Sequence, residues 1–516
     1  MWPFNRKNKE KPSKRSYQAA MIDRLVADWN ASTTSAEAEI RGGLLTVRNR
    51  SRDLARNNDY YRNILKLLQV NVIGEGMPFQ AQIRMQRGGL LDKELNNKIE
   101  YEFNKWAKAD SCDVSGKLSF YEMQGMAIRA PAQDGDVFFR KIKQAFGKSK
   151  VPAALEMIEA DLCDEQHNEE LSDGRCIRMG IEYNEWLRPI AYHFKTKHPG
   201  DNGYGYTANS RIIRVPANEV IHMFKTERPR QGRGMPWLTS AMMKMHHMNG
   251  YMDAEVIGAR ASSSLMGFIE SPEGQLEGDD VDAGQRVTEF EPGVFKQLNP
   301  GEKMNVPQLN KPGNQFAPFM QVMLRGVAAG AGISYESVSR DYSTVTYSSA
   351  RQALLEDRDY WKVLQTWTIE HFSQNIIEFW LDQAVLSGVL NLPKYFQDTE
   401  KYYSAIKWMP RGWNWVDPVK ETGANLASVR SGFMTASQVV AQMGGDYEEL
   451  VAQRAREIEI AKKYGVKFDS DLENDVPKNP QPTSSEDPKD DSEDDKTEDA
   501  LDTEGVKSKF NLEMSH

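Results

Sequence analysis

The feature that most constrains the fold is a helical pattern of apolar residues that runs from residue 346 to residue 388. Apolar side chains recur there at intervals compatible with one face of a single helix. Such a helix would extend over about 65 Å at 1.5 Å per residue, which is long for a globular protein and predicts a spine. The residues that define its apolar face are Leu354, Trp361, Leu364, Phe372, Ile376 and Trp380.

Short strands and further helices fill the rest of the chain, without the strand–helix rhythm of a parallel α/β protein. We therefore expect a helix-rich α+β fold of several domains, because single cores stop growing well below 516 residues. Alternating apolar residues predict strands at 79–85, 135–143, 154–160, 176–184 and 189–196. Helical spacing predicts helices at 41–73, 90–107, 119–130, 236–262 and 317–330, and a helix pair at 418–462 divided by Gly444 and Gly445.

The helix expected at 236–262 carries a stripe of methionines, among them Met242, Met245 and Met252. Methionine fills irregular gaps in a core, but it also suits an adaptable interface between subunits. The sequence leaves both interpretations open. The segment that follows, 263–313, is rich in Gly, Pro and Asp and reads as loop, with strand-like patches at 265–269 and 294–298.

The charge of the chain is unevenly distributed. Residues 468–504 contain fifteen Asp and Glu residues against three Lys, a net charge of −12, and we expect this tail to be disordered. Because the whole chain carries −9, the remainder sums to +3. Residues 5–15 form a short basic arm within a flexible N-terminal segment. We expect the tail to be either a solvated extension or a segment that repels DNA.

Three cysteines and the lack of an apolar leader predict a protein made in a reducing cytosol. No run of about 18 apolar residues appears, so we expect no membrane segment.

Motifs of enzyme chemistry are absent from the sequence: it contains no G-x-x-x-x-G-K-[ST], G-x-S-x-G or H-E-x-x-H. We interpret GDNGYGY (200–206) as a surface turn. The Cys, acidic and His residues of DLCDEQH (161–167) suggest a metal site, but zinc would need a further pair of ligands, so we interpret this segment as the end of a strand and a turn. His246 and His247 are adjacent, so they face different sides of a helix. DSDLEND (469–475) lacks the glycine of an EF-hand loop. We expect no metal and no cofactor.

Residues 326–353, GVAAGAGISYESVSRDYSTVTYSSARQA, predict two helices joined by an exposed polar loop. In the loop, Tyr342 and Tyr347 alternate with hydroxyl residues, and Asp341 is the one charge. This composition suits an ordinary surface connection. It also suits a loop that touches DNA without gripping its phosphates, as lysine and arginine would.

The same stretch resembles the signature G-(I/V)-SYE-x-(L/V)-SR-(D/N)-Y-x-x-x-(S/T)-Y-S-(S/T)-AR of the lambda family of tailed-phage portal proteins. Three further blocks resemble that family in the same order, over about residues 40–465. They are RSRDLARNNDYYRNIL…NVIGEGM (51–77), YEFNKWAKADSCDV with SFYEMQGMAIRAPAQDGDVFFR (101–140), and VIHMFKTERPRQGRGMPWLTSAMMKM (220–245).

The resemblance implies a portal fold with wing, stem, clip and crown, assembled as a ring of about twelve copies whose interfaces are heterologous and self-closing. It implies these parts: 1–40 basic arm, 41–235 wing, 236–262 first stem helix, 263–313 clip, 314–340 second stem helix, 341–348 tunnel loop, 349–417 spine helix and rest of the wing, 418–467 helical crown, and 468–516 acidic tail. The implied tunnel loop consists of Asp341, Tyr342, Ser343, Thr344, Val345, Thr346, Tyr347 and Ser348.

The resemblance also implies a virion protein without catalytic residues. The ring would sit at one capsid vertex, nucleate procapsid assembly and conduct double-stranded DNA in packaging and ejection. Its implied partners are the terminase large subunit, the head-completion or connector protein, and the major capsid and scaffold proteins. The alternatives are a minor capsid or scaffold-type head protein without a channel, and a metal-dependent nuclease.

Two arginines, Arg340 and Arg351, flank the loop. We expect them to tie it to the neighbouring helices through carboxylates such as Glu336 or Asp341.

Overall fold

The computed structural model describes most of the chain and divides it into two compact units, Met1–Tyr447 and Glu448–His516. The described residues are 30–85, 91–201, 211–264, 268–270, 303–305, 315–343, 345–413, 418–443 and 447–466, with Arg24, Asp28 and Gly445 as isolated residues. The predicted acidic tail, most of the basic arm and most of the predicted clip lie outside them.

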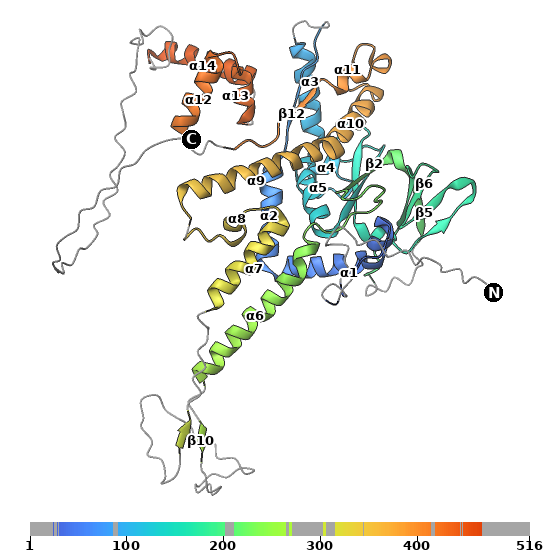
Figure 1. Cartoon of the computed structure of the whole chain (residues 1–516). Coiled ribbons are helices and arrows are strands. Elements are labelled where there is room, and N and C mark those ends of the chain that lie inside the picture. Colours follow the sequence, from blue (N-terminus) through green and yellow to red (C-terminus); the bar gives the residue numbers. More distant parts are fainter. Residues whose placement is uncertain are drawn as a thin grey trace, which may run out of the picture. The chain divides into compact units, whose positions relative to one another are not determined.

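The expected spine is present as a helix with one interruption (Figure 1). It consists of α9, a single π-helical turn and α10, so the sequence prediction of one helical path is confirmed. A π turn accommodates one extra residue, which the average apolar spacing does not reveal. The bounds are Tyr347–Thr368 for α9, Ile369–Ser373 for the π turn and Gln374–Leu386 for α10.

The helix predicted at 41–73 is divided by Asn58. The Asn58 side chain accepts a hydrogen bond from the Tyr61 backbone N–H (2.7 Å), which caps a new helix. The chain therefore turns at Asn58. The resulting elements are α1 (Ala36–Asn57), α2 (Asp59–Leu68) and a second π turn at Gln69–Ile73. Since α1 begins at Ala36, the end of the segment expected to be flexible is helical.

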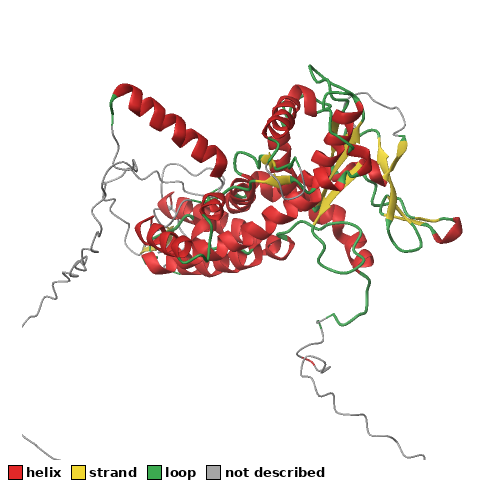
Figure 2. Cartoon of the chain, turned by 90° about the horizontal axis from the view of Figure 1, so that it is seen from above, coloured by secondary structure: helices red, strands yellow, loops and turns green. Residues whose placement is uncertain are grey.

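Helices α3 (Lys93–Trp106), α4 (Ala109–Cys112) and α5 (Phe120–Asp134) pack against two of the sheets (Figure 1). Seen from above, strands and helices lie beside one another in this part of the molecule (Figure 2). All sheets in the described ranges are antiparallel, as expected for an α+β fold. The segment 176–184 is a hairpin and not one strand. The sheets are β1 (Phe79–Ala81) with β12 (Ile406–Trp408), β3 (Ala154–Ile158) with β2 (Asp136–Ile142) and β9 (Val220–Phe224), and β4 (Glu169–Glu170), β5 (Cys176–Arg178), β6 (Ile181–Tyr183), β7 (Pro189–Lys195) and β8 (Ile212–Pro216) in that order.

Helices α6 (Thr239–Ser264) and α7 (Phe316–Ala331) lie side by side, and the chain descends along one and returns along the other (Figure 1). Helix α6 begins at Thr239, three residues later than predicted. The segment between them includes the antiparallel pair β10 (Phe268–Glu270) and β11 (Lys303–Asn305), which overlaps the strand-like patch predicted at 265–269. The patch at 294–298 lies outside the described residues.

The methionine stripe of α6 is core in its first half. Met242, Met245 and Met248 are buried against α2, α7 and their neighbours, whereas Met252 is half-buried and Val256 is exposed. The core interpretation is thus confirmed for the first half of the stripe, and the interface interpretation stays a prediction for the rest.

Two large cores hold the first unit together. One joins α3, α5 and α10 to the β1–β12 pair around Phe103, Trp106 and Trp380. The other joins α2 and the base of α6 to α7 and α9 around Tyr61, Leu364 and Val327. A third, smaller core lies under the five-stranded sheet.

The C-terminal segment predicted as two helices forms three: α12 (Pro418–Arg430), α13 (Ala436–Gln442) and α14 (Tyr447–Tyr464). Thr435 explains the extra break, because its side chain and that of Gln438 form a reciprocal cap at the start of α13. No helix in the described part of the chain has the length and apolarity to cross a membrane.

Candidate functional site

The polar loop that the sequence singled out is held between two capped helix ends. Gly332, in a left-handed conformation (φ 67°), ends α7, and the short helix α8 (Tyr335–Ser339) follows. Arg340, also left-handed (φ 61°), ends α8. Thr346 and Ser349 then exchange hydrogen bonds that begin α9. The loop is therefore short, and its ends are fixed by local hydrogen bonds.

Within the loop, aromatic and hydroxyl side chains face solvent. Tyr342 is 56% exposed and Tyr347 is 62% exposed, while Ser343, Thr346 and Ser348 are exposed as well. Val345 is half-buried, and Thr344 lies outside the described residues. Apart from Asp341, the described loop thus presents an uncharged, polar surface.

The one charge of the loop is used internally. The Asp341 carboxylate accepts hydrogen bonds from the Ser343 backbone N–H (3.1 Å), the Ser343 hydroxyl (2.6 Å) and the Tyr335 hydroxyl (3.3 Å). The bonds from Ser343 are the main cause that lowers the pKa of Asp341, so the group stays ionised. Its charge is therefore stabilised by donors from the loop and from α8.

A buried carboxylate on α9, Asp357, fixes α8 in place. Asp357 is 3% exposed and accepts from the Ser334 N–H (2.8 Å), the Ser334 hydroxyl (2.7 Å) and the Ser337 hydroxyl (3.0 Å). Burial raises the pKa of Asp357, and these hydrogen bonds oppose that rise. Ser334 and Ser337 therefore have a structural role. Asp357 is a residue of the site that we did not expect from the sequence. Its signal was a carboxylate on the apolar stripe between Leu354 and Trp361.

The flanking residues have different partners from those expected. Arg340 donates to the Asn63 side chain (3.4 Å) on α2, and Arg351 lies 3.8 Å from the Glu421 carboxylate of α12. Neither pairs with Asp341, whose oxygens accept from Ser343 and Tyr335, nor with Glu336. Asn63 also donates to the Ser337 and Val338 carbonyls (3.0 and 2.9 Å), so α2 supports the end of α8.

The base of α6 is anchored by a buried ionic network built from the segment RPRQGRG (228–234), which precedes the helix. Arg233 is fully buried, pairs with Asp136 of β2 and donates to the carbonyls of Ala160, Cys163 and Met179 (2.9 to 3.1 Å). Burial alone would raise the pKa of Asp136, but Arg233 and His222 lower it well below its ordinary range.

The same network includes α1. Arg48, also fully buried, lies 3.8 Å from Asp136 and 3.2 Å from Glu165. Its Nε donates to the Asp134 carbonyl at the end of α5 (3.1 Å). The network thus connects α1, α5 and β2 to the segment that precedes α6.

Gly234 and Gly135 make the closest backbone approach at this junction. A Cβ on Gly234 would overlap the Gly135 carbonyl oxygen, and Gly135 itself has a φ of 95°. Glycine is therefore required at both positions. The close approach of Gly234 to Gly135 therefore fixes the path of the chain just before α6 begins.

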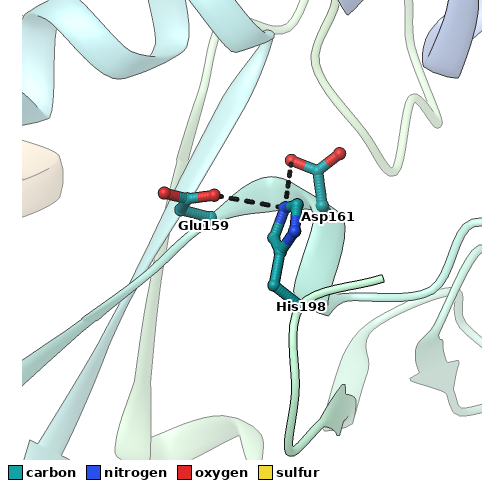
Figure 3. A group of neighbouring side chains, drawn as sticks. All are labelled: Glu159, Asp161 and His198. Carbon is teal, nitrogen blue, oxygen red and sulfur yellow. Dashed lines mark ion pairs between the residues drawn. The ribbon is translucent and has the colours of Figure 1, made fainter. Parts of the chain in front are cut away.

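A group that could be taken for a metal site lies near this network (Figure 3). His198 Nε2 is 3.4 Å from Glu159 and 3.8 Å from Asp161. However, Asp161 also accepts from Arg52 (2.5 Å) and lies 3.4 Å from Arg48. Two guanidinium groups on one carboxylate disfavour a cation there, so we interpret the group as an ion-pair cluster.

The family model described as "Phage portal protein, lambda family" matches residues 23–365, which include α1 to α8, the loop and most of α9. The chain belongs to the lambda family of phage portal proteins. The matched residues include Asp357, which fixes α8, and Arg233, whose ionic network anchors α6. Both features therefore lie in the part of the chain that matches the family. The sequence resemblance is thereby confirmed.

Individual portal proteins are similar along nearly the whole chain. The probable portal protein of Halomonas phage phiHAP-1 is 32% identical over 473 residues, which cover 90% of each chain. Portal protein B of Escherichia phage lambda is 23% identical over 471 residues, covering 85% of this chain and 88% of the relative. The portal protein of Escherichia phage N15 is 23% identical over 461 residues, covering 83% and 87%.

Solved structures with detectable likeness come from gene transfer agent (GTA) particles. The neck of the native GTA particle gives a TM-score of 0.38 at 13% identity, covering 78% of this chain and 98% of that one. The neck of the empty particle gives 0.40 at 12% identity, covering 77% and 93%. The family assignment rests on the sequence matches and not on these superpositions.

Proposed function

We propose that the chain forms the portal ring of a tailed phage. About twelve copies would close around a channel at one capsid vertex and conduct double-stranded DNA in both directions. The observation that carries this proposal is the loop at 341–348. Among its described residues the one carboxylate accepts hydrogen bonds from Ser343 and Tyr335, two tyrosines are exposed, and the buried Asp357 fixes α8, which precedes the loop.

The parts of the ring are proposed from the same arrangement. The α6–α7 pair would be the stem, the segment between them the clip, and the sheets with α3, α5 and α10 the wing. Helices α12 to α14 would belong to the crown. The clip would meet the terminase during packaging and the head-completion protein afterwards, while the outer surfaces would meet capsid and scaffold proteins.

Ring closure needs two different faces on each copy, and the α6–α7 pair offers apolar side chains that the single chain leaves exposed. Val256 and Ile257 on α6 are 51% and 64% exposed, and Phe319 and Val322 on α7 are 45% and 65% exposed. Exposed apolar side chains on two adjacent helices are typical of surfaces that are covered on assembly. We propose that neighbouring copies bury them.

The loop supports the proposed contact with DNA because it offers nothing that would hold a phosphate tightly. Serine and threonine hydroxyls and tyrosine rings contact a duplex without releasing many counterions, so the contact made by the loop itself would depend only weakly on salt. The portal family is structural, which is consistent with a protein that performs no chemistry. A Mg²⁺-dependent cleavage assay on duplex DNA tests the nuclease alternative, and we expect no cleavage.

The ring is tested by the double variant Val256→Asp/Val322→Asp. Each carboxylate would lose water on assembly without gaining a partner, and the cost recurs at every interface of the ring. We expect monomers with an unchanged circular dichroism spectrum, where the unmodified chain forms rings in native mass spectrometry. Leu386→Asp is the matched control, because Leu386 on α10 is 64% exposed and lies outside the α6–α7 pair. Rings formed equally well by the double variant would contradict this use of the two helices.

A further inference from the structure

A cluster of cationic side chains lies on α2 and α5, and α2 packs against α8, the helix that precedes the loop. Arg62 and Lys66 are exposed and lie four residues apart on α2, so they occupy the same face of the helix. Arg129 is half-buried on α5, which packs against α2. Burial and the charge of Arg62 both lower the pKa of Arg129.

No carboxylate neutralises this cluster within the described ranges. Asp134 is near Arg129, but both of its oxygens accept from Arg52 (2.9 and 3.0 Å). Asp59 precedes Arg62 by one helical turn and forms no ion pair with it in the described part of the chain. Two guanidinium groups, one of them half-buried, thus lie together without a counter-charge, which is an unfavourable arrangement unless an anion comes from outside the chain.

The cluster continues to the loop through α2. Asn63, next to Arg62 in the sequence, accepts from Arg340 and donates to two carbonyls of α8. On a helix, Lys66 lies between the directions of Arg62 and Asn63. The positive surface therefore runs from α5 across α2 to Arg340 at the start of the loop.

We propose that Arg62, Lys66 and Arg129 bind backbone phosphates of duplex DNA that lies against the loop. Guanidinium groups are suited to phosphate oxygens because they can donate two parallel hydrogen bonds. The proposal rests on the proposed portal function and adds to it the residues that hold the duplex.

The loop and the cation cluster would have different roles in contact with the duplex, because only the cluster carries positive charge. The loop itself has no lysine or arginine and would let the duplex pass, while a few cations next to it would keep the backbone at a defined distance. Each copy would neutralise at most about three phosphates, so its own share of the affinity is small and falls with salt in proportion to the phosphates neutralised. Weak, sequence-independent binding is what a moving duplex requires.

The test is the affinity of the full-length chain for a short labelled DNA duplex of arbitrary sequence, measured by fluorescence anisotropy over a series of NaCl concentrations. We expect Arg62→Ala/Lys66→Ala to weaken binding by about three- to tenfold at low salt. The slope of log Kd against log salt should flatten by about 0.9 for each phosphate that the variant no longer neutralises. Both side chains are exposed, so the double variant should fold. Adding Arg129→Ala should weaken binding further, and Arg129→Lys should retain most of it.

The matched control is Lys148→Ala/Lys150→Ala, which removes the same charge from exposed positions between β2 and β3. An equal loss of affinity in the control would overturn the proposal, because it would show a general charge effect. Unchanged DNA binding with a loss of rings would also overturn it and would assign the cluster to an interface between copies. In both cases rings of the unmodified chain would still support the portal function, so the two failures are distinguishable.

Discussion

Replacing Asp357 with alanine tests whether α8 and the loop depend on one buried carboxylate. The change removes the acceptor of three hydrogen bonds, from the Ser334 N–H and from the Ser334 and Ser337 hydroxyls. Hydrogen bonds to a charged group contribute about 1.5–3 kcal/mol each, but bonds that share one acceptor are not additive. We expect a total loss of about 3 kcal/mol for the closed state of α8, since water and nearby groups replace some of these bonds.

This loss should be local, because all three hydrogen bonds to Asp357 come from Ser334 and Ser337 at the start of α8. A change of about 3 kcal/mol corresponds to about a hundredfold increase in the opening constant of the segment. Hydrogen exchange measured by mass spectrometry on peptides that span 333–346 should show it. Asp357→Asn should give an intermediate effect, since the amide keeps one acceptor oxygen.

The matched control is Asp359→Ala, two residues further along α9. Asp359 is exposed and pairs with Lys362 at 3.2 Å on the helix surface, an ion pair that contributes about 0.3–0.5 kcal/mol. Protection of α8 should be unchanged in this control. If Asp357→Ala exchanged no faster than Asp359→Ala at 333–346, the role assigned to Asp357 would be refuted.

The junction below α6 gives two further predictions. Burial lowers the pKa of His222, so the unfolded chain binds a proton at this residue more readily than the folded chain, and the folded state should lose stability as the pH drops below about 6.5. In thermal unfolding, a His222→Gln variant should therefore lose less stability than the unmodified chain between pH 7.5 and 5.5. A variant with the same pH dependence as the unmodified chain would contradict this. Gly234→Ala places a methyl group against the Gly135 carbonyl and should lower the free energy of unfolding by about 3 kcal/mol or more. Gly250→Ala, on the open face of α6, should leave stability unchanged or raise it slightly. Equal melting temperatures for the two variants would show that the backbone at Gly234 and Gly135 relaxes to admit the methyl group.

The apolar periodicity predicted most helices because it reports burial on one face, and burial decides where helices lie. It placed α5, α6, α7 and the α9–α10 path within a few residues of their bounds. It did not detect the break at Asn58 or the π turns, because a capping side chain or one extra residue changes the direction of a helix and not its average spacing. The division of 418–462 into three helices was missed for the same reason.

Buried charges were the main feature that the sequence could not predict. Arg48 lies on the apolar face of α1 beside Leu44, yet its partners Asp136 and Glu165 are distant in the sequence. Asp357 likewise depends on Ser334 and Ser337 across a helix boundary. The residue types of the loop were evident from the sequence, whereas the hydrogen bonds that hold it depend on which helices become neighbours.

The most direct test of the portal function is native mass spectrometry of the purified full-length chain, combined with negative-stain images of the same sample. We expect a closed ring of about twelve copies with a central hole. A monomer or dimer that forms no ring at high concentration would contradict the proposed function.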